Sequence, residues 1–209
     1  VGAMVGAERV VLPLLAQSDF GLASRTAILS FIVSFGIVKA GANLFAGRLG
    51  DRIGRKRVLI AGWLFGLPVP LLLYFAPSWS WIVFANILLG LNQGFAWSTT
   101  VIMKIDIVGP KRRGLAMGLN EAAGYLAVSG AALLAGYLAG SYGYRSALLW
   151  VGGVAAVLGL VLSVLSVRES RSHVEVEGRG QTVPERSFRE IFWLVSWRDR
   201  TLFSVSQAG

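Results

Sequence analysis

Four ionisable side chains lie within long apolar stretches of this sequence, where a charge is costly. They are Glu8, Arg9, Lys39 and Glu121. In the hydrocarbon core of a bilayer each charge costs at least ~2.5 kcal/mol on insertion scales, so such side chains usually face a cavity or one another. We interpret them as lining or bordering a central polar cavity. The uncharged side chains that we expect to join them are Asn43, Asn86, Asn92 and Gln93. The alternative is structural, with buried pairs that hold the helices together.

The composition indicates a membrane protein. Of the 209 residues, 55% are hydrophobic and 15% are charged, and the mean hydropathy is +0.63, which is too apolar for one water-soluble core. A helix needs about 20 residues to cross ~30 Å of hydrocarbon, and six apolar segments approach that length. They cover residues 1–16, 26–47, 58–75, 79–103, 114–139 and 146–167. The sequence therefore predicts an all-α, polytopic transmembrane helix bundle over residues 1–167.

The placement of the basic residues predicts the orientation of this bundle. The net charge is +9, and two of the connections between segments carry most of the basic residues. These are Arg48, Arg52, Arg55, Lys56 and Arg57 in one, and Lys104, Lys111, Arg112 and Arg113 in the other. By the positive-inside rule both connections face the cytoplasm. We therefore expect a multi-pass protein of the cell membrane with both ends of the chain cytoplasmic. Because the basic residues form short blocks, we expect no nucleic-acid partner.

The composition changes after the sixth segment. Residues 168–200 are largely polar and charged, and we interpret them as a flexible cytoplasmic linker. Within it, residues 187–197 place apolar side chains on one helical face, which predicts a helix in the membrane interface. An apolar run begins again at residues 201–209, and we interpret it as the truncated start of a seventh helix.

Several kinds of chemistry are disfavoured by the residues present. The chain has no cysteine, and its one histidine, His173, lies in the polar linker. We therefore expect no metal site, no cofactor and no catalytic residues. The sequence also contains neither a G-x-x-x-x-G-K-[ST] loop nor a Gly-x-Ser-x-Gly elbow, so it predicts neither an ATP-driven pump nor a hydrolase of that type.

The connection between the second and third segments has a specific pattern. It reads GRLGDRIGRKRVL over residues 47–59. Gly47 and Gly54 allow the backbone to turn sharply and approach a neighbouring helix. Asp51 is the one acid among five bases, so it can pair with Arg52 or Arg55, or with the positive end of a helix. A loop that only sets topology would explain the bases but not the placed glycines and the acid.

This pattern resembles the signature loop between helices two and three of the major facilitator superfamily, G-x-L-a-D-r-x-G-r-K-x-x-L, with Gly50 where alanine is commoner. Residues 106–114 likewise resemble the family's loop between helices four and five. The resemblance implies the amino-terminal half of a transporter, with six helices arranged as a 3+3 inverted repeat. The partner that it implies is the missing carboxy-terminal half. The residues that it implies for a conformational latch are Gly47, Asp51, Arg52, Gly54, Arg55, Lys56 and Asp106.

The function implied by the resemblance is secondary active transport of a small solute by alternating access, coupled to protons or another ion. Gly90 replaces the helix-four arginine of many drug exporters, and residues 129–136 lack the proline common in helix five of antiporters. A drug:proton antiport mechanism is therefore not carried over. Arg9 and Lys39 favour an anionic solute, while multidrug-type efflux and uptake both stay open. The alternative is a non-transporting sensor or scaffold with the same fold.

Small residues and prolines predict details of the packing. Gly62 with Gly66, Gly90 with Gly94, and Gly136 with Gly140 each have the spacing that lets helices pack closely. Pro68 and Pro70 predict a kink in the third span, and Pro13 predicts one in the first.

Overall fold

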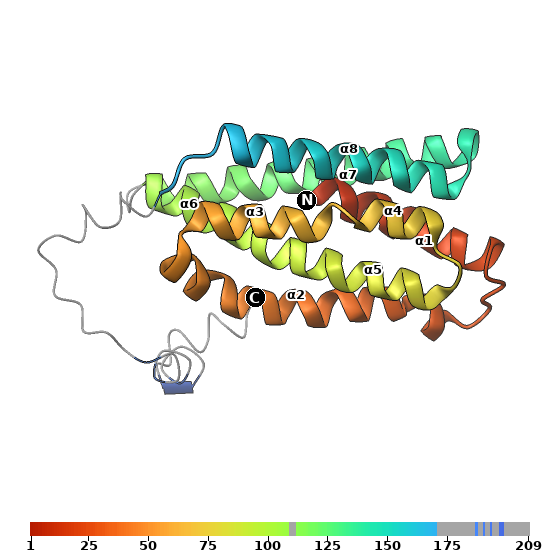
Figure 1. Cartoon of the computed structure of the whole chain (residues 1–209), viewed down its shortest axis with the longest axis horizontal. Helices are drawn as coiled ribbons and strands as arrows, with labels where there is room; N and C mark the ends of the chain where they lie inside the picture. Colours follow the sequence, from red (N-terminus) through yellow and green to blue (C-terminus); the bar gives the residue numbers. More distant parts are fainter. Residues whose placement is uncertain (109–111, 171–186, 188–189, 191–192, 194–196, 199–209) are drawn as a thin grey trace, which may run out of the picture. The chain divides into compact units, whose positions relative to one another are not determined.

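The fold is a bundle of long helices. The computed structural model describes residues 1–108, 112–170, 187, 190, 193, 197 and 198. It divides into two compact units, Val1–Val174 and Glu175–Gly209, which are described separately. The helices of the first unit are α1 (Gly2–Ser18), α2 (Arg25–Ile53), α3 (Arg55–Gly66), α4 (Val69–Phe75), α5 (Trp79–Asn92), η1 (Gln93–Trp97), α6 (Ser98–Val108), α7 (Arg113–Tyr142) and α8 (Tyr144–Leu165) (Figure 1).

Six helical paths run along the bundle, as the sequence predicted. Four of them are long and apolar enough to cross a membrane: Ile28–Ile53, Arg55–Phe75, Arg113–Tyr142 and Tyr144–Leu165. The first path, α1, has 17 residues, and the fourth consists of α5, η1 and α6 in succession. The all-α transmembrane architecture is therefore confirmed.

Two of the paths are interrupted. The third divides between α3 and α4, and Pro68 is the residue that precedes α4, so the helix is interrupted where the sequence predicted a kink. The fourth contains the π-helical turn η1 (Gln93–Trp97), which no feature of the sequence predicted. Single π-helical turns within α-helices occur frequently at functional sites.

The contacts between helices repeat within the bundle. The first path packs on the fifth and sixth, because α1 contacts α7 and α8, and the fourth packs on the second and third, because α5 and η1 contact α2 and α3. The first path thus has the same relation to the fifth and sixth as the fourth has to the second and third. A 3+3 repeat, in which paths one to three correspond to paths four to six, requires this pattern.

Glycines allow the closest of these contacts. A Cβ at Gly90 would lie 2.8 Å from the carbonyl oxygen of Phe35, and one at Gly62 would lie 2.8 Å from the backbone nitrogen of Ala96. The predicted packing role of these glycine pairs is therefore confirmed. The third pair differs, since a Cβ at Gly136 would come no closer than 3.9 Å to Val10 and one at Gly140 would meet nothing within 4 Å.

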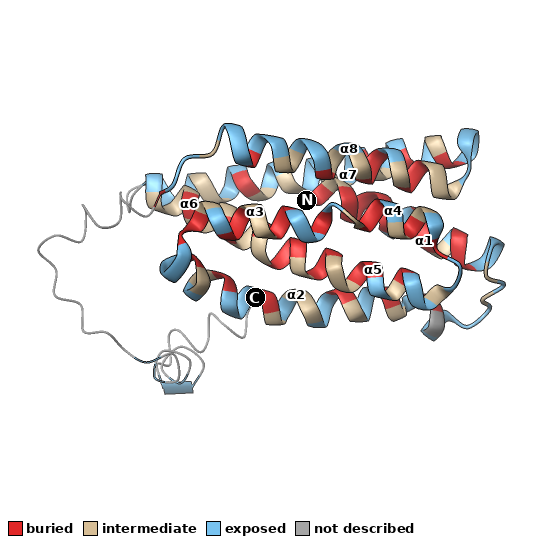
Figure 2. Cartoon of the chain, viewed as in Figure 1, coloured by how far each residue is buried: buried red, intermediate tan, exposed pale blue. Residues whose placement is uncertain are grey.

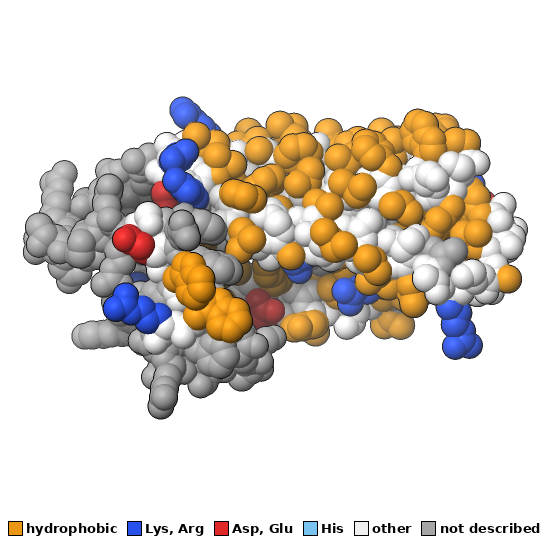
Figure 3. All heavy atoms as spheres, turned by 90° about the horizontal axis from the view of Figure 1, so that it is seen from below, with side chains coloured by type: hydrophobic (Ala, Val, Ile, Leu, Met, Phe, Trp, Pro, Cys, Tyr) orange, Lys and Arg blue, Asp and Glu red, His pale blue; other side chains and the backbone are white. Residues whose placement is uncertain are grey.

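The outer surface of the bundle is apolar. Buried residues gather between the helices, whereas outward faces are exposed (Figure 2). Large apolar side chains remain exposed on α7 and α8, among them Leu126 at 74%, Leu133 at 78% and Leu165 at 77%. Apolar side chains also cover most of the described face in Figure 3. A surface of this kind suits contact with the lipid bilayer.

Two described residues of the second unit, Ser187 and Glu190, hydrogen-bond to each other. The backbone N–H of Ser187 donates to Glu190 Oε2 at 2.8 Å, and the N–H of Glu190 donates to Ser187 Oγ at 3.3 Å. This reciprocal pair is a capping box, which marks the start of a helix. Most residues of the predicted interfacial helix at 187–197, and all of the predicted seventh-helix start at 201–209, lie outside the described residues.

Candidate solute pocket and charge clusters

A cavity of about 190 Å³ lies between α1, α2, η1 and α7, and we call it the charged pocket. Four of the predicted cavity residues line it, namely Arg9, Lys39, Gln93 and Glu121. The other residues that line it are Gly2, Val5, Trp97, Gly124, Tyr125 and Val128. The structure therefore brings together most of the ionisable side chains that the sequence placed at membrane depth.

The charges of this pocket are not joined as ion pairs. The ion pairs of the described residues are Arg55 with Asp51 and Asp106, and Arg145 with Asp19, so none in this part of the chain involves Arg9, Lys39 or Glu121. The Lys39 ammonium instead lies 5.8 Å from the centroid of the Phe35 ring, a cation–π distance.

Glu121 is held by neutral and basic neighbours outside the pocket wall. Its Oε1 accepts a hydrogen bond of 3.3 Å from Asn120 Nδ2, and Asn120 Oδ1 accepts one of 2.6 Å from Lys104 Nζ. With two cations and one carboxylate among its lining residues, the pocket carries a net positive charge when all three are ionised.

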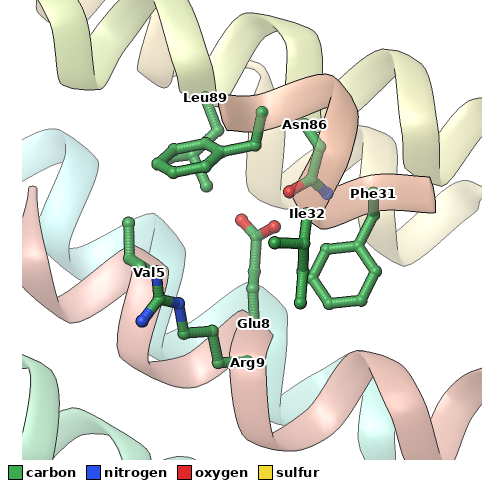
Figure 4. A pocket seen from close by; sticks show the side chains of 8 residues that line it. Val5, Glu8, Arg9, Phe31, Ile32, Asn86 and Leu89 are labelled. Atoms are coloured by element: carbon green, nitrogen blue, oxygen red, sulfur yellow. The ribbon is translucent and has the colours of Figure 1, made fainter. Parts of the chain in front are cut away.

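Glu8 lies beside this pocket, in a separate small space that shares Val5 and Arg9 with it. Figure 4 shows the Glu8 carboxylate pointing toward Asn86, with Phe31 and Ile32 next to it. The residue is only 3% exposed, and its Oε2 has no hydrogen-bond partner among the described residues. Glu8 is therefore a buried carboxyl next to the charged pocket, not one of its lining residues.

Two predicted cavity residues lie elsewhere. Asn43 accepts a 2.8 Å hydrogen bond from Ser98 Oγ, which joins α2 to α6. Asn92 donates a 2.9 Å hydrogen bond to the carbonyl oxygen of Gly62, which joins α5 to α3. Neither residue lines the charged pocket, and these bonds assign both to packing between helices.

Sequence reasoning missed Trp97, Gly124 and Tyr125. A Cβ at Gly124 would lie 2.2 Å from Trp97 Cη2, so the indole packs directly on the α7 backbone. The four-residue spacing of Gln93 and Trp97 was a signal that both share one face of a helix. No sequence feature showed that α7 offers a glycine opposite that face.

A second group of charges surrounds Arg55 at the start of α3, and we call it the Arg55 cluster. Its guanidinium contacts the carboxylate of Asp106 through Nη1 and that of Asp51, at 3.1 Å, through Nη2. Ser170 Oγ donates a 2.9 Å hydrogen bond to Asp106 Oδ2. The side chains of Arg55 and Asp106 are 10% and 9% exposed, whereas that of Asp51 is 68% exposed. Asp106, one of the residues that the resemblance implied for the latch, thus contacts Arg55 of the loop at 47–59.

Glu169 completes the Arg55 cluster. Its two carboxylate oxygens each accept a 3.0 Å hydrogen bond, from the backbone N–H groups of Arg55 and Lys56. These are the first residues of α3, where unpaired N–H groups and the helix dipole favour an anion. Gly54 has φ +96°, and a Cβ there would lie 2.7 Å from Glu169 Oε2, so both backbone conformation and space require glycine. Glu169 was not predicted.

The opposite end of the bundle has a smaller charged group, which we call the Arg145 cluster. Arg145 Nε donates to Asp19 Oδ2 at 2.8 Å, and its Nη1 donates to the carbonyl oxygens of Tyr74 and Ala76 at 2.9 Å each. The guanidinium also lies 5.5 Å from the centroid of the Phe20 ring. The hydrogen bond from Arg145 lowers the pKa of Asp19 below its ordinary value of 3.8. This cluster joins the ends of α1 and α4 to the start of α8.

Comparisons with known proteins agree with this geometry. A family model for the Major Facilitator Superfamily matches residues 3–208. The chain is 27% identical to the inner membrane transport protein YnfM of Escherichia coli (strain K12), over 92% of this chain and 44% of the relative. It is 34% identical to the 3-(3-hydroxy-phenyl)propionate transporter of the same strain, over 68% and 34%. It is 30% identical to multidrug resistance protein 2 of Bacillus subtilis (strain 168), over 75% and 39%.

The chain spans less than half the length of these curated relatives. The family match covers nearly all of its residues, including the loop at 47–59 and both charge clusters. The chain therefore belongs to the Major Facilitator Superfamily.

Proposed function

We propose that the protein containing this chain is a secondary active transporter that moves a small organic anion by alternating access. The observation that carries the proposal is the charged pocket, in which Arg9 and Lys39 meet no ion-pair partner among the described residues. Two cations facing a single carboxylate in a cavity favour an anionic ligand, because the ligand supplies the negative charge that the pocket lacks.

Two relatives bear on the choice of solute. One is named as a transporter of 3-(3-hydroxy-phenyl)propionate, which is an organic anion, and another as a multidrug resistance protein. The positive pocket favours the first kind of solute for this chain, because an exporter of cationic or neutral drugs gains nothing from two unpaired cations. A sensor or scaffold that only keeps the fold would have no use for them either.

We further propose that a second six-helix half completes the site. In transporters of this kind the solute lies at the interface between two halves, which rock around it. In this proposal the Arg55 cluster serves as the latch, at the cytoplasmic end of the bundle. The partners are then the bilayer, the second half and the solute, in a cell membrane, with both ends of this chain in the cytoplasm.

Glu8 is our candidate for proton coupling. A carboxyl can take up and release one proton during a transport cycle, and Glu8 lies beside the charged pocket with an unpartnered oxygen. A Glu8→Gln variant should therefore still exchange solute across the membrane but lose the response of net transport to a proton gradient. A response equal to that of the wild type would exclude Glu8 from coupling.

The experiment that tests the function is a panel of solutes presented to the complete transporter in proteoliposomes, with and without a proton gradient. We expect transport of small carboxylates, driven by the gradient. Transport of cations alone would overturn the anion proposal, and transport of no solute at all would favour the sensor or scaffold. The sign of the gradient that drives net movement distinguishes uptake from efflux.

A further inference from the structure

One wall of the charged pocket is formed by aromatic and amide side chains that the anion proposal does not use. Gln93 and Trp97 come from η1, and Tyr125 comes from α7. The two cations are enough to bind an anion by its charge, so they do not explain the two aromatic rings beside them. This wall therefore indicates which groups the solute has besides its anionic group.

Trp97 has a fixed place in this wall. It is the last residue of η1, four positions after Gln93, so the two side chains lie on the same side of the helical turn. The indole packs on α7 at Gly124, where a Cβ would lie 2.2 Å from Cη2 and 3.0 Å from Cζ3. An added methyl group at Gly124 would force the ring to move, so Gly124 determines how far Trp97 reaches toward α7.

Gln93, which lines the same wall, has a hydrogen-bond acceptor without a partner among the described residues. The residue is 7% exposed, and its Oε1 has no hydrogen-bond partner among the described residues. A buried polar atom without a partner is costly, and the cost is offset when a ligand supplies the missing group. A hydroxyl or N–H group of the solute would supply that donor.

The part of the site that this chain lines has room for one ring. Its volume is about 190 Å³, and the second half would add to it. A flat ring also packs well on an indole face, because offset and edge-on arrangements of aromatic rings are favourable.

We propose that the charged pocket selects an aromatic carboxylate with a hydrogen-bond donor on its ring: the carboxylate lies near Arg9 and Lys39, the ring packs against Trp97, and the donor bonds to Gln93. This inference rests on the proposed transport of an organic anion, and it adds the class of solute and a role for three residues in specificity. Gln93 recognises the hydrogen-bond donor, Trp97 recognises the ring, and Gly124 positions Trp97.

The test compares three probes in the complete transporter in proteoliposomes: 4-hydroxybenzoate, benzoate and cyclohexanecarboxylate. They share the carboxylate and differ in the donor and in the flatness of the ring. In the wild type we expect the transport efficiency to fall in the order in which they are named. In Gln93→Leu the transport of 4-hydroxybenzoate relative to that of benzoate should fall about tenfold, the effect of losing one hydrogen bond. Gln93→Met, which keeps the length of the side chain, repeats the measurement if the leucine variant does not fold.

The ring is tested with Gly124→Ala. This variant should lower transport of both aromatic probes relative to that of cyclohexanecarboxylate. The matched control is Gly130→Ala on the same helix, where a Cβ would meet nothing within 4 Å, and it should transport all three probes as the wild type does.

The outcomes separate the two proposals. Equal transport of benzoate and cyclohexanecarboxylate by the wild type, or a Gln93→Leu variant that keeps the preference for 4-hydroxybenzoate, would overturn the aromatic inference and leave anion transport standing. Transport of none of the three probes would overturn the inference, and the wider panel of carboxylates described above then decides whether anion transport also fails.

Discussion

The Arg55 cluster and the charged pocket use the same kinds of residue in opposite ways. In the cluster, the buried guanidinium of Arg55 contacts the carboxylates of Asp51 and Asp106. In the pocket, Arg9 and Lys39 share one carboxylate, Glu121, and none of the ion pairs of the described residues includes them. Removing one partner of a buried ion pair destabilises the fold, whereas a charge left unpaired in a cavity is available to a ligand.

The two regions also differ in the helices that they join. The Arg55 cluster connects α2, α3, α6 and the residues just after α8 at one end of the bundle (Figure 1). The pocket is lined by α1, α2, η1 and α7. Only α2 belongs to both, so the pocket and the cluster can be altered separately. The predictions below use that independence.

The largest effect on stability is expected for Asp106→Asn. This change leaves the guanidinium of Arg55, 10% exposed, without its buried partner, and the loss of one member of a buried ion pair costs about 3 kcal/mol or more. Thermal unfolding of the purified protein in detergent would measure it. Asp51→Asn is the matched control, because Asp51 is 68% exposed and exposed pairs contribute at most about 1 kcal/mol. Equal losses for the two variants would contradict the difference in burial.

Neutralising Arg9 should have the opposite pattern. Arg9→Gln removes a cation that has no ion-pair partner among the described residues, so the unfolding temperature should stay within a few degrees of the wild type or rise. Transport of the anion should fall roughly 30- to 150-fold, because losing the partner of a desolvated charge costs about 2–3 kcal/mol. If Arg9→Gln unfolded as early as Asp106→Asn, the pocket would have to be regarded as a structural charge network.

Removing the cap of α3 should give a smaller loss. Glu169→Ala deletes the carboxylate that accepts hydrogen bonds from the backbone N–H groups of Arg55 and Lys56, and caps of this kind contribute about 1–2 kcal/mol. The neighbouring exposed residue gives the control, as Arg168→Ala removes a side chain of similar position without touching the cap. A stability of Glu169→Ala equal to that of the control would show that solvent replaces the cap at no cost.

The sequence predicted the bundle better than the pocket. Six spans, an irregularity at Pro68 and the close packing at Gly62 and Gly90 follow from local hydropathy and residue type, so each could be predicted from a short window of sequence. The packing of Trp97 on Gly124 is a contact between η1 and α7, which no short window contains, and the turn η1 had no signal in the sequence.

Polar residues show the same limit. Asn92 and Gln93 are adjacent and chemically similar, yet Asn92 donates to the carbonyl oxygen of Gly62 and Gln93 lines the pocket. Their directions differ because successive helical residues point about 100° apart, and the sequence does not say which direction leads to a cavity. Glu169 was missed because its partners are backbone N–H groups, which no side-chain pattern reveals.

The Arg145 cluster gives the smallest and most pH-dependent effect, because it is paired like the Arg55 cluster but half-exposed. The hydrogen bond from Arg145 lowers the pKa of Asp19 in the folded state. The pair therefore contributes its full stability above the pKa of Asp19 in the unfolded chain, near 3.8. This contribution is lost as the pH falls through the lower pKa of the folded state. Wild type should therefore be slightly more stable than Asp19→Asn at pH 6, and the gap in unfolding temperature should close as the pH is lowered below about 4. Comparing the two proteins at each pH cancels the titration of the other carboxyl groups. A gap that stayed constant down to pH 3 would mean that Arg145 is held by the carbonyl oxygens of Tyr74 and Ala76 alone. Pairing with a carboxylate would then contribute to stability only where the pair is buried, as it is between Arg55 and Asp106.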